Sequence, residues 1–307
     1  MVFLARWANS GFWPTVLLLI ILFYASLVIP LMNIPGGAII AMLAMQYGAA
    51  AVFRLIVVSG ICIAAFSFFA QDSMLFWVSM VWVGYMIMEG ATGWIVHNSG
   101  RMESGLQVLA LIAIAVCMSF YGLMDDPVGQ WEVWLKKLLD RSEYETLSDQ
   151  AGWPLDEMTT MLAPNMPGLT GAIILLHSAG GLILGRFWQS RLFRPGAFSR
   201  EFLSIGFRWQ FGAVLVGCAL IAMITGMAIM RNTSMVLVGL LAIQGLAIIH
   251  AWAAYKGIPW VWIGMGYASM IFLFPLIGII WLFLAALAVI DSWTDIRARL
   301  GNESGTS

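Results

Sequence analysis

Charged side chains are scarce in this 307-residue sequence: Asp, Glu, Lys and Arg together make up only 10% of it, whereas 61% is apolar. A water-soluble domain is about a quarter charged and about half apolar. So few charges cannot cover the surface of a soluble protein of 33.8 kDa. The composition therefore excludes a soluble globular protein and predicts a helical membrane protein, because a membrane-spanning helix needs about 20 mostly apolar residues.

The sequence also lacks the motifs of several functional classes. The net charge is −1 and there is no long basic run, which excludes nucleic-acid binding. His-Glu-x-x-His, Gly-x-Ser-x-Gly and Gly-x-x-x-x-Gly-Lys motifs are missing, so the chain has no sign of a metalloprotease, a serine nucleophile or an ATP site. The three cysteines, Cys62, Cys117 and Cys218, lie inside apolar runs without ligand-like spacing and are predicted to be packing residues. We expect no enzymatic activity, no cofactor and no metal.

Long apolar runs occupy most of the chain. A stretch over residues 258–290 is too long for one untilted crossing and has Pro275 and Gly278 at its midpoint, so it predicts either one kinked helix or a hairpin of two short crossings. We predict one all-α integral membrane domain over residues 1–307 with about nine to ten transmembrane spans. The eight other runs cover residues 13–30, 36–53, 55–70, 74–97, 105–124, 165–186, 209–230 and 234–255.

Basic residues predict which side of the membrane each loop occupies, since cytoplasmic loops carry an excess of Lys and Arg. The connector over residues 186–208 has five arginines against Glu201, whereas the loop over residues 125–163 is mainly acidic and is predicted to lie outside. We therefore predict a bacterial inner (cytoplasmic) membrane protein with a cytoplasmic N-terminus. A cytoplasmic tail with Arg297 and Arg299 favours the hairpin for residues 258–290. The positions predicted to be cytoplasmic are Arg6, Arg54, Arg101, the connector and Lys256.

The outer loop contains one amphipathic segment. Its apolar residues recur at i, i+3, i+4, i+7 and i+8, while charged residues occupy the other face. This spacing predicts an interfacial amphipathic helix over residues 130–147 that lies on the membrane surface. It is either a surface-docked connector or a lid over an outward-facing cavity. The apolar face consists of Trp131, Trp134, Leu135, Leu138 and Leu139.

Ionisable and polar groups inside the apolar runs are the candidate functional residues, because such groups are costly in a bilayer and usually face a protein interior or a water-filled cavity. Each histidine has the alternative role of a hydrogen-bonded packing residue, and two histidines, or histidines with Glu89, are the residue types that bind haem or a metal. Arg54 and Arg101 are the basic residues that could pair with Glu89. The candidate solute cavity is lined by Glu89, His97, His177, Gln244 and His250.

Glycines mark the expected close helix contacts. Gly181 and Gly185 form a Gly-x-x-x-Gly pair that favours intramolecular helix packing, and Gly93 lets a neighbouring backbone approach. The Asn33-Ile-Pro-Gly-Gly37 segment predicts a helix break, either as a turn at the outer interface or as polar backbone that needs protein or water around it.

Four segments of the C-terminal half form a recognisable pattern. They are Leu192-Phe-Arg-Pro-Gly-Ala-Phe-Ser-Arg-Glu-Phe202, Gln244-Gly-Leu-Ala-Ile-Ile-His250, Tyr255-Lys-Gly-Ile-Pro259 and Ile290-Asp-Ser-Trp-Thr-Asp-Ile-Arg297. Through them, residues 165–300 resemble the YybS-like family of uncharacterised bacterial integral membrane proteins. The resemblance implies a plan distantly similar to the substrate-binding membrane subunits of energy-coupling-factor vitamin transporters, which bind a small solute and leave ATP hydrolysis to partners.

Two functions follow from these features. The first is a solute-binding or transport-related membrane protein that uses the candidate cavity. The second is a non-transporting scaffold or assembly factor that binds a protein partner at the cytoplasmic face through Arg191, Arg194 and Arg200. In both, the lipid bilayer is a partner, and the sequence names no small-molecule ligand.

Overall fold

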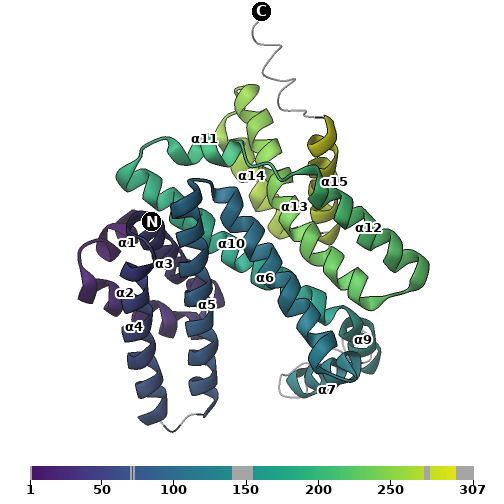
Figure 1. Cartoon of the computed structure of the whole chain (residues 1–307), viewed down its shortest axis with the longest axis horizontal. Helices are drawn as coiled ribbons and strands as arrows, with labels where there is room; N and C mark the ends of the chain where they lie inside the picture. Colours follow the sequence, from purple (N-terminus) through teal and green to yellow (C-terminus); the bar gives the residue numbers. More distant parts are fainter. Residues whose placement is uncertain (1, 70, 72, 140–154, 273–276, 295–307) are drawn as a thin grey trace, which may run out of the picture. The chain divides into compact units, whose positions relative to one another are not determined.

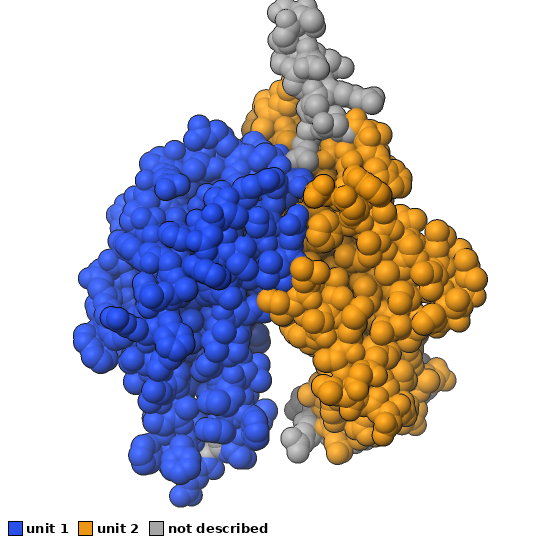
Figure 2. Space-filling view, in the orientation of Figure 1, with its two compact units in different colours: residues 1–109, 176–206 blue, residues 110–175, 207–307 orange. Residues whose placement is uncertain are grey.

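The protein is described by a computed structural model that covers residues 2–69, 71, 73–139, 155–272 and 277–294. These residues form α-helices and short 3-10 turns and contain no strand, so the all-α prediction is confirmed. The chain divides into two compact units (Figure 2). Unit 1 comprises residues 1–109 and 176–206, and unit 2 comprises residues 110–175 and 207–307.

Unit 1 is built from the N-terminal helices and the second half of one later helix (Figure 1). Its elements are α1 (Val2–Ala8), α2 (Phe12–Val28), η1 (Pro30–Met32), α3 (Asn33–Tyr47), α4 (Ala49–Phe69), α5 (Ser73–Ser99), the first turns of α6 (Met102–Leu123), the second half of α10 (Met166–Phe193) and α11 (Ala197–Leu203).

Unit 2 contains the remaining parts of α6 and α10 and the C-terminal helices. Its other elements are α7 (Pro127–Leu139), α9 (Leu155–Leu162), η2 (Ala163–Asn165), α12 (Trp209–Thr225), α13 (Ala228–Tyr255), α14 (Trp260–Phe272) and α15 (Ile277–Thr294). Helix α13 packs mainly against α15 and α12.

Among the described residues, five helical segments are long and apolar enough to cross a membrane: α4, α5, α6, the segment over residues 156–193, and α13. Three further apolar helices, α2, α12 and residues 278–294 of α15, are shorter. A helix of 17 residues, such as α2, is about 26 Å long, slightly less than the hydrocarbon thickness of a bilayer. The chain is therefore a polytopic helical membrane protein, and the total of nine to ten crossings stays a prediction.

Helix boundaries differ from the apolar runs at two places in unit 1. Arg54 was expected in a loop but lies inside α4, because the break occurs earlier, at Gly48. Gly48 has a φ of 82°, and its N–H caps α3 by donating to the carbonyl of Ala44, a backbone conformation that favours glycine. The break expected over Asn33–Gly37 also comes earlier, since these residues form the first turns of α3.

The basic connector is partly helical. Arg186 and Arg191 were expected in a loop, but α10 continues to Phe193 and includes both. Long arginine side chains allow this extension, because the apolar stem remains along the helix while the charged group reaches a polar partner or solvent. The residues between α10 and α12 contain α11, which packs on α10 through an edge-to-face contact of the Phe187 and Phe198 rings, with the centroids 5.4 Å apart.

The amphipathic segment of the outer loop is helical over Pro127–Leu139, and its predicted continuation to residue 147 lies outside the described residues. The helix packs against α9 and η2 with Leu135 buried, whereas Trp134 and Leu138 stay exposed. Lys136 forms ion pairs of 2.9 Å with Glu132 and Asp156. Hydrogen bonds to Asp156 and Glu132 raise the pKa of Lys136 above its usual value. These contacts dock the helix on α9 and η2, and the choice between a surface-docked connector and a lid stays a prediction.

The apolar stretch over residues 258–290 gives two helices, α14 and α15. Whether it turns back between them depends on residues 273–276, including Pro275, which lie outside the described residues, as do Arg297 and Arg299.

Helix α3 is the most tightly enclosed element of unit 1. A Cβ added at Gly93 of α5 would lie 2.7 Å from the carbonyl oxygen of Ala41, and one added at Gly185 of α10 would lie 2.6 Å from that of Ala38. Both neighbours are backbone atoms of α3, so α5 and α10 approach it through glycines. The Gly-x-x-x-Gly pair is thus used for intramolecular packing, as predicted.

Candidate functional site

A buried polar cluster forms in unit 1 where α3, α5 and α10 meet. Helix α5 supplies Tyr85 and Glu89, which are four residues apart and therefore lie on one face of the helix, one turn from each other. The Glu89 side chain has no solvent exposure. Carboxylate and phenol groups are thus held within the protein rather than at its surface.

Two glycines bring the neighbouring helices against this pair. A Cβ added at Gly181 of α10 would lie 2.6 Å from Glu89 Oε1 and 3.1 Å from the Tyr85 hydroxyl oxygen. One added at Gly37 of α3 would lie 2.9 Å from Glu89 Cγ and would overlap the Tyr85 hydroxyl. Only glycine leaves room for the two polar side chains at these positions.

The turn of α10 before Gly181 adds two more polar groups. The His177 ring makes an edge contact with the Tyr85 ring, with the centroids 5.1 Å apart. Ser178 is fully buried, and its hydroxyl has no hydrogen-bond partner among the described residues. On α3, Asn33 lies one turn before Gly37, and its Oδ1 also lacks a partner within the described part of the chain. The cluster thus has polar side chains from α5 and α10 and is incompletely hydrogen-bonded.

Glu89 is the one member of the cluster with a carboxyl group, and no described residue supplies a countercharge for it. The Tyr85 hydroxyl interacts with its carboxylate, but neither carboxylate oxygen has a well-formed hydrogen bond to any described residue. Arg54 and Arg101 do not provide the expected countercharge, because Arg54 is exposed and Arg101 pairs with Glu103 at 2.5 Å. An ionised carboxylate in these surroundings costs several kcal/mol. Glu89 is therefore either neutral or paired with a bound cation.

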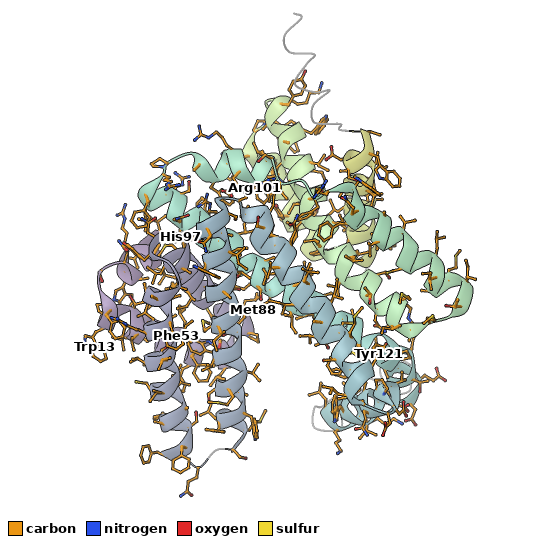
Figure 3. All side chains as sticks on the ribbon, viewed as in Figure 1. Trp13, Phe53, Met88, His97, Arg101 and Tyr121 are labelled. Carbon is orange, nitrogen blue, oxygen red and sulfur yellow. The ribbon has the colours of Figure 1, made fainter. Side chains whose placement is uncertain are left out.

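Among the other predicted site residues, His97 belongs to unit 1 but not to the cluster. It lies in the last turn of α5, just before Arg101 (Figure 3). Its Nδ1 is 2.8 Å from the carbonyl oxygen of Met45, near the end of α3. The contact satisfies a carbonyl that the last turn of a helix leaves free. His97 thus ties the ends of α5 and α3 together.

Gln244 and His250 belong to unit 2 and have partners there. Gln244 Oε1 accepts a bond from the Phe207 N–H at 2.8 Å, and its amide nitrogen lies 3.3 Å from Asp291 Oδ2. His250 Nδ1 is bonded to the carbonyl of Leu246 at 2.8 Å, and its Nε2 lies 3.2 Å from the Tyr267 hydroxyl. The structure therefore brings Glu89 and His177 together and assigns Gln244 and His250 to separate contacts.

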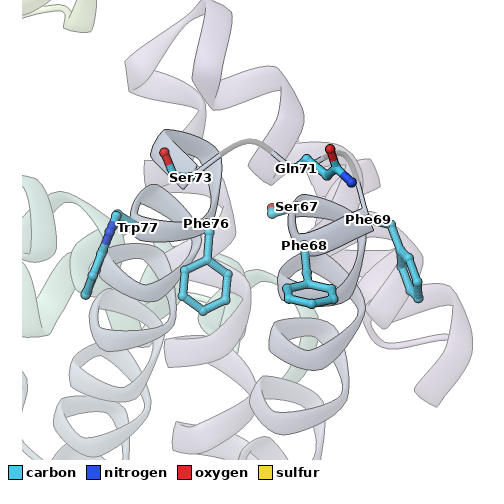
Figure 4. Close-up of a pocket in the computed structure, with 7 residues that line it drawn as sticks. All are labelled: Ser67, Phe68, Phe69, Gln71, Ser73, Phe76 and Trp77. Carbon is cyan, nitrogen blue, oxygen red and sulfur yellow. The ribbon is translucent and has the colours of Figure 1, made fainter.

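Two hollows lie away from this cluster. One of about 230 Å³ lies between α13 and α14 and has His250 and Tyr267 among mainly apolar side chains. The other, of about 530 Å³, lies at the turn between α4 and α5 (Figure 4). Phe68, Phe76 and Trp77 line it, with few polar atoms. Neither combines buried, unpaired polar groups as the cluster does.

The basic connector is fixed at one end of unit 1. Glu201 of α11 accepts a hydrogen bond from the Met102 N–H at 2.6 Å and pairs with Arg186 Nε at 2.7 Å. Its carboxylate therefore caps α6, where negative charge is favourable. The three arginines of the candidate partner surface, Arg191, Arg194 and Arg200, are exposed and form no ion pair within the described residues.

Sequence reasoning found two members of the cluster and missed two. Tyr85 was overlooked although it lies four residues before Glu89, and Ser178 although it follows His177. A signal was present in both cases. The Tyr85 hydroxyl lies one helical turn from an ionisable residue of an apolar run, and the Ser178 hydroxyl directly follows one. Gly37 was considered only as part of a helix break.

No protein-family model matches this chain, and no curated protein or solved structure does either. The resemblance to the YybS-like family thus stays a prediction, and the chemistry of the cluster has to support any functional proposal.

Proposed function

We propose that this chain is a transport-related membrane protein that carries a cation across the bilayer and binds it at Glu89. The observation that supports this most is the fully buried Glu89 carboxylate, which no described residue neutralises. Intramembrane ionisable residues usually belong to substrate or ion pathways, because their cost is otherwise not offset. The predicted resemblance to vitamin-transporter subunits agrees with a transport-related class.

The helices around Glu89 support the same proposal. Glu89 is on α5 and its neighbours His177 and Ser178 are on the segment over residues 156–193, and both segments have the length and hydropathy of membrane spans. Tyr85 supplies a hydroxyl oxygen beside the carboxylate, and the buried, unpartnered hydroxyl of Ser178 lies on α10, the helix that packs against it. Carboxylate and hydroxyl oxygens are suited to hard cations and to protons, which makes a cation the fitting class of bound species.

The test is cation flux through the purified full chain in proteoliposomes. Inward gradients of H⁺, Na⁺ and K⁺ are imposed in turn and followed with trapped ion-sensitive dyes. We expect at least one cation to enter faster than into protein-free vesicles, and Glu89→Gln to reduce that rate to the protein-free level. Glu157→Gln, at an exposed position on α9, is the matched control and should retain the flux. Flux of none of the three cations, or equal flux through Glu89→Gln, would contradict the proposal.

We also propose a bacterial inner-membrane location with the N-terminus in the cytoplasm. The basic positions of unit 1 support it, since they gather at one end. Asn9, directly after α1, bonds to Tyr47 at 2.7 Å, and Gln46 bonds to Gln189 at 3.2 Å. These bonds bring the end of α3 beside the N-terminal helix and the end of α10, so Arg6, Arg101 and the connector share that end. A common basic end is typical of the cytoplasmic side.

A second candidate function is a scaffold that binds a protein partner through the connector. The exposed, unpaired state of Arg191, Arg194 and Arg200 favours it. Replacing all three with Glu should abolish recovery of partners that cross-link to this face in intact cells, since reversed charge repels an acidic surface. Lys137→Glu, at an exposed position of α7, is the control. An unchanged set of cross-linked partners would exclude the scaffold.

A further inference from the structure

We infer that the species bound at Glu89 is a proton, and that loss of this proton separates α3 and α10 from α5. The inference rests on the proposed function, because it names the cation and the helices that respond to it. Three observations carry it: the space around the carboxyl group, the charges that face it, and the glycines that close over it.

Space is the first observation. At Gly181, even one added carbon would come within 2.6 Å of Glu89 Oε1, and at Gly37 one would come within 2.9 Å of Glu89 Cγ. A sodium or potassium ion needs several oxygen ligands around it, together with the volume of its own radius. The close approach of α10 at Gly181 and of α3 at Gly37 therefore leaves little space beside the carboxyl group for an ion with its ligands. A proton needs no additional volume, so it fits the closed cluster as it stands.

The second observation is that no described basic residue on the helices packed around Glu89 forms an ion pair with it. On α5 the nearby titratable group is Tyr85, and on α10 it is His177. Helix α3 has no charged residue along its length, and α2, which contacts α3 at Gly36, also has none.

Three arginines on these helices are not available to Glu89. Arg54 of α4 and Arg191 of α10 are exposed, and Arg186 of α10 is engaged by Glu201. No described residue thus neutralises the carboxylate, and we infer that a proton does so in this closed arrangement.

The third observation links proton binding to helix packing. When Glu89 is neutral, α3 and α10 can remain in contact with it through Gly37 and Gly181. When Glu89 is ionised, the same contacts hold a charge in apolar surroundings, which is favourable only if water or new donors reach it. Gly37 and Gly181 hold α3 and α10 close to the carboxyl group, so water reaches it more readily once these helices move. Ionisation therefore favours a state in which α3 and α10 have moved away and Ser178 is exposed to water.

Protonation is tested directly by infrared spectroscopy of the detergent-solubilised full chain, because a protonated carboxyl group has a C=O stretching band that a carboxylate lacks. At neutral pH we expect one such band that Glu89→Gln removes and Glu157→Gln retains. It should disappear as the pH rises and should not change when Na⁺ replaces K⁺. A spectrum without the band, or a band that Na⁺ suppresses, overturns the inference.

Helix separation is tested by water exposure of a cysteine at the cluster. In Ser178→Cys, the rate of modification by a water-soluble maleimide should rise about tenfold per pH unit until Glu89 is deprotonated, since the rate follows the ionised fraction. Rates are corrected for thiolate formation with a separate Lys137→Cys variant as the standard, because Lys137 is exposed on α7, outside the candidate membrane-spanning helices. Adding Glu89→Gln, which keeps the residue neutral, should abolish the pH dependence. Equal rates with and without this change overturn the inference.

These measurements do not depend on transport. If the infrared band and the cysteine response are found but no cation crosses the vesicle membrane, the proton site stands and the transport proposal fails. If Na⁺ flux depends on Glu89 and the band is missing, the transport proposal stands and the proton inference fails. Should Glu89→Gln fail to fold, the pH and Na⁺ dependence of the wild-type band still decides.

Discussion

Gly185→Leu in α10 should destabilise unit 1 by about 3 kcal/mol, at the upper end of the cost of overpacking a protein interior. The first added carbon alone would lie 2.6 Å from the Ala38 carbonyl oxygen and 3.1 Å from the Met42 nitrogen. Both are backbone atoms in the middle of α3, so no side-chain rotation relieves the overlap. Helix α3 would have to move, and it is also in close contact with Gly93 of α5.

The measurement is the thermal unfolding midpoint of the purified variant in detergent, read by the fluorescence of buried Trp82 and its neighbours. Gly84→Leu is the matched control, because Gly84 lies in α5 of the same unit and a Cβ there would meet nothing within 4 Å. A midpoint for Gly185→Leu equal to that of Gly84→Leu would mean that α10 does not approach α3 through this glycine.

Asn232→Leu in α13 should cost unit 2 about 3 kcal/mol, because it leaves several buried polar groups without partners. Asn232 Oδ1 accepts a bond from the Gly168 N–H at 2.8 Å. Its Nδ2 donates to the Tyr121 hydroxyl at 2.6 Å and to the carbonyl of Pro164 at 2.9 Å. One side chain thus joins α13 to α6, to η2 and to the start of α10. Leucine matches its size but offers neither donor nor acceptor.

The effect is measured as the denaturant midpoint of the purified chain, together with hydrogen exchange of the Gly168 amide, which should lose its protection. Thr233→Val provides the comparison, since the Thr233 hydroxyl bonds only to the carbonyl of Ile229 in its own helix. If Asn232→Leu and Thr233→Val have the same midpoint, Asn232 does not connect these helices.

Composition and hydropathy were sufficient to predict the fold class, because the bilayer imposes a single requirement, a run of apolar residues, on every span. They were not sufficient to predict where helices end. Gly48 ends α3 through its backbone conformation, and a hydropathy run does not record this. Arg54 was misleading for a related reason. A charge count treats an arginine within a helix and an arginine in a loop alike, so it does not show where the helix begins.

The candidate site was predictable only in part. Glu89 was found because a carboxylate in an apolar run is exceptional, and this holds without knowledge of the packing. Which histidines join it depends on the helix pairing. His177 reaches the cluster because α10 packs on α5 and α3, whereas His250 is on a helix of unit 2. Asn232 was missed because its partners, Gly168 and Tyr121, are 64 and 111 residues away in the sequence.

The Glu201 carboxylate has a further consequence for the surface next to it. Because it bonds to both Met102 and Arg186, it joins α11 to the first residue of α6 and to the C-terminal part of α10. Arg191, Arg194 and Arg200 are therefore displayed on a frame that is already ordered before anything binds. Because this face is already ordered, the protein would lose less conformational entropy on binding a lipid headgroup or a protein here than a flexible loop would. The arginines would then discriminate between anionic surfaces by the spacing of their charges as well as by their number.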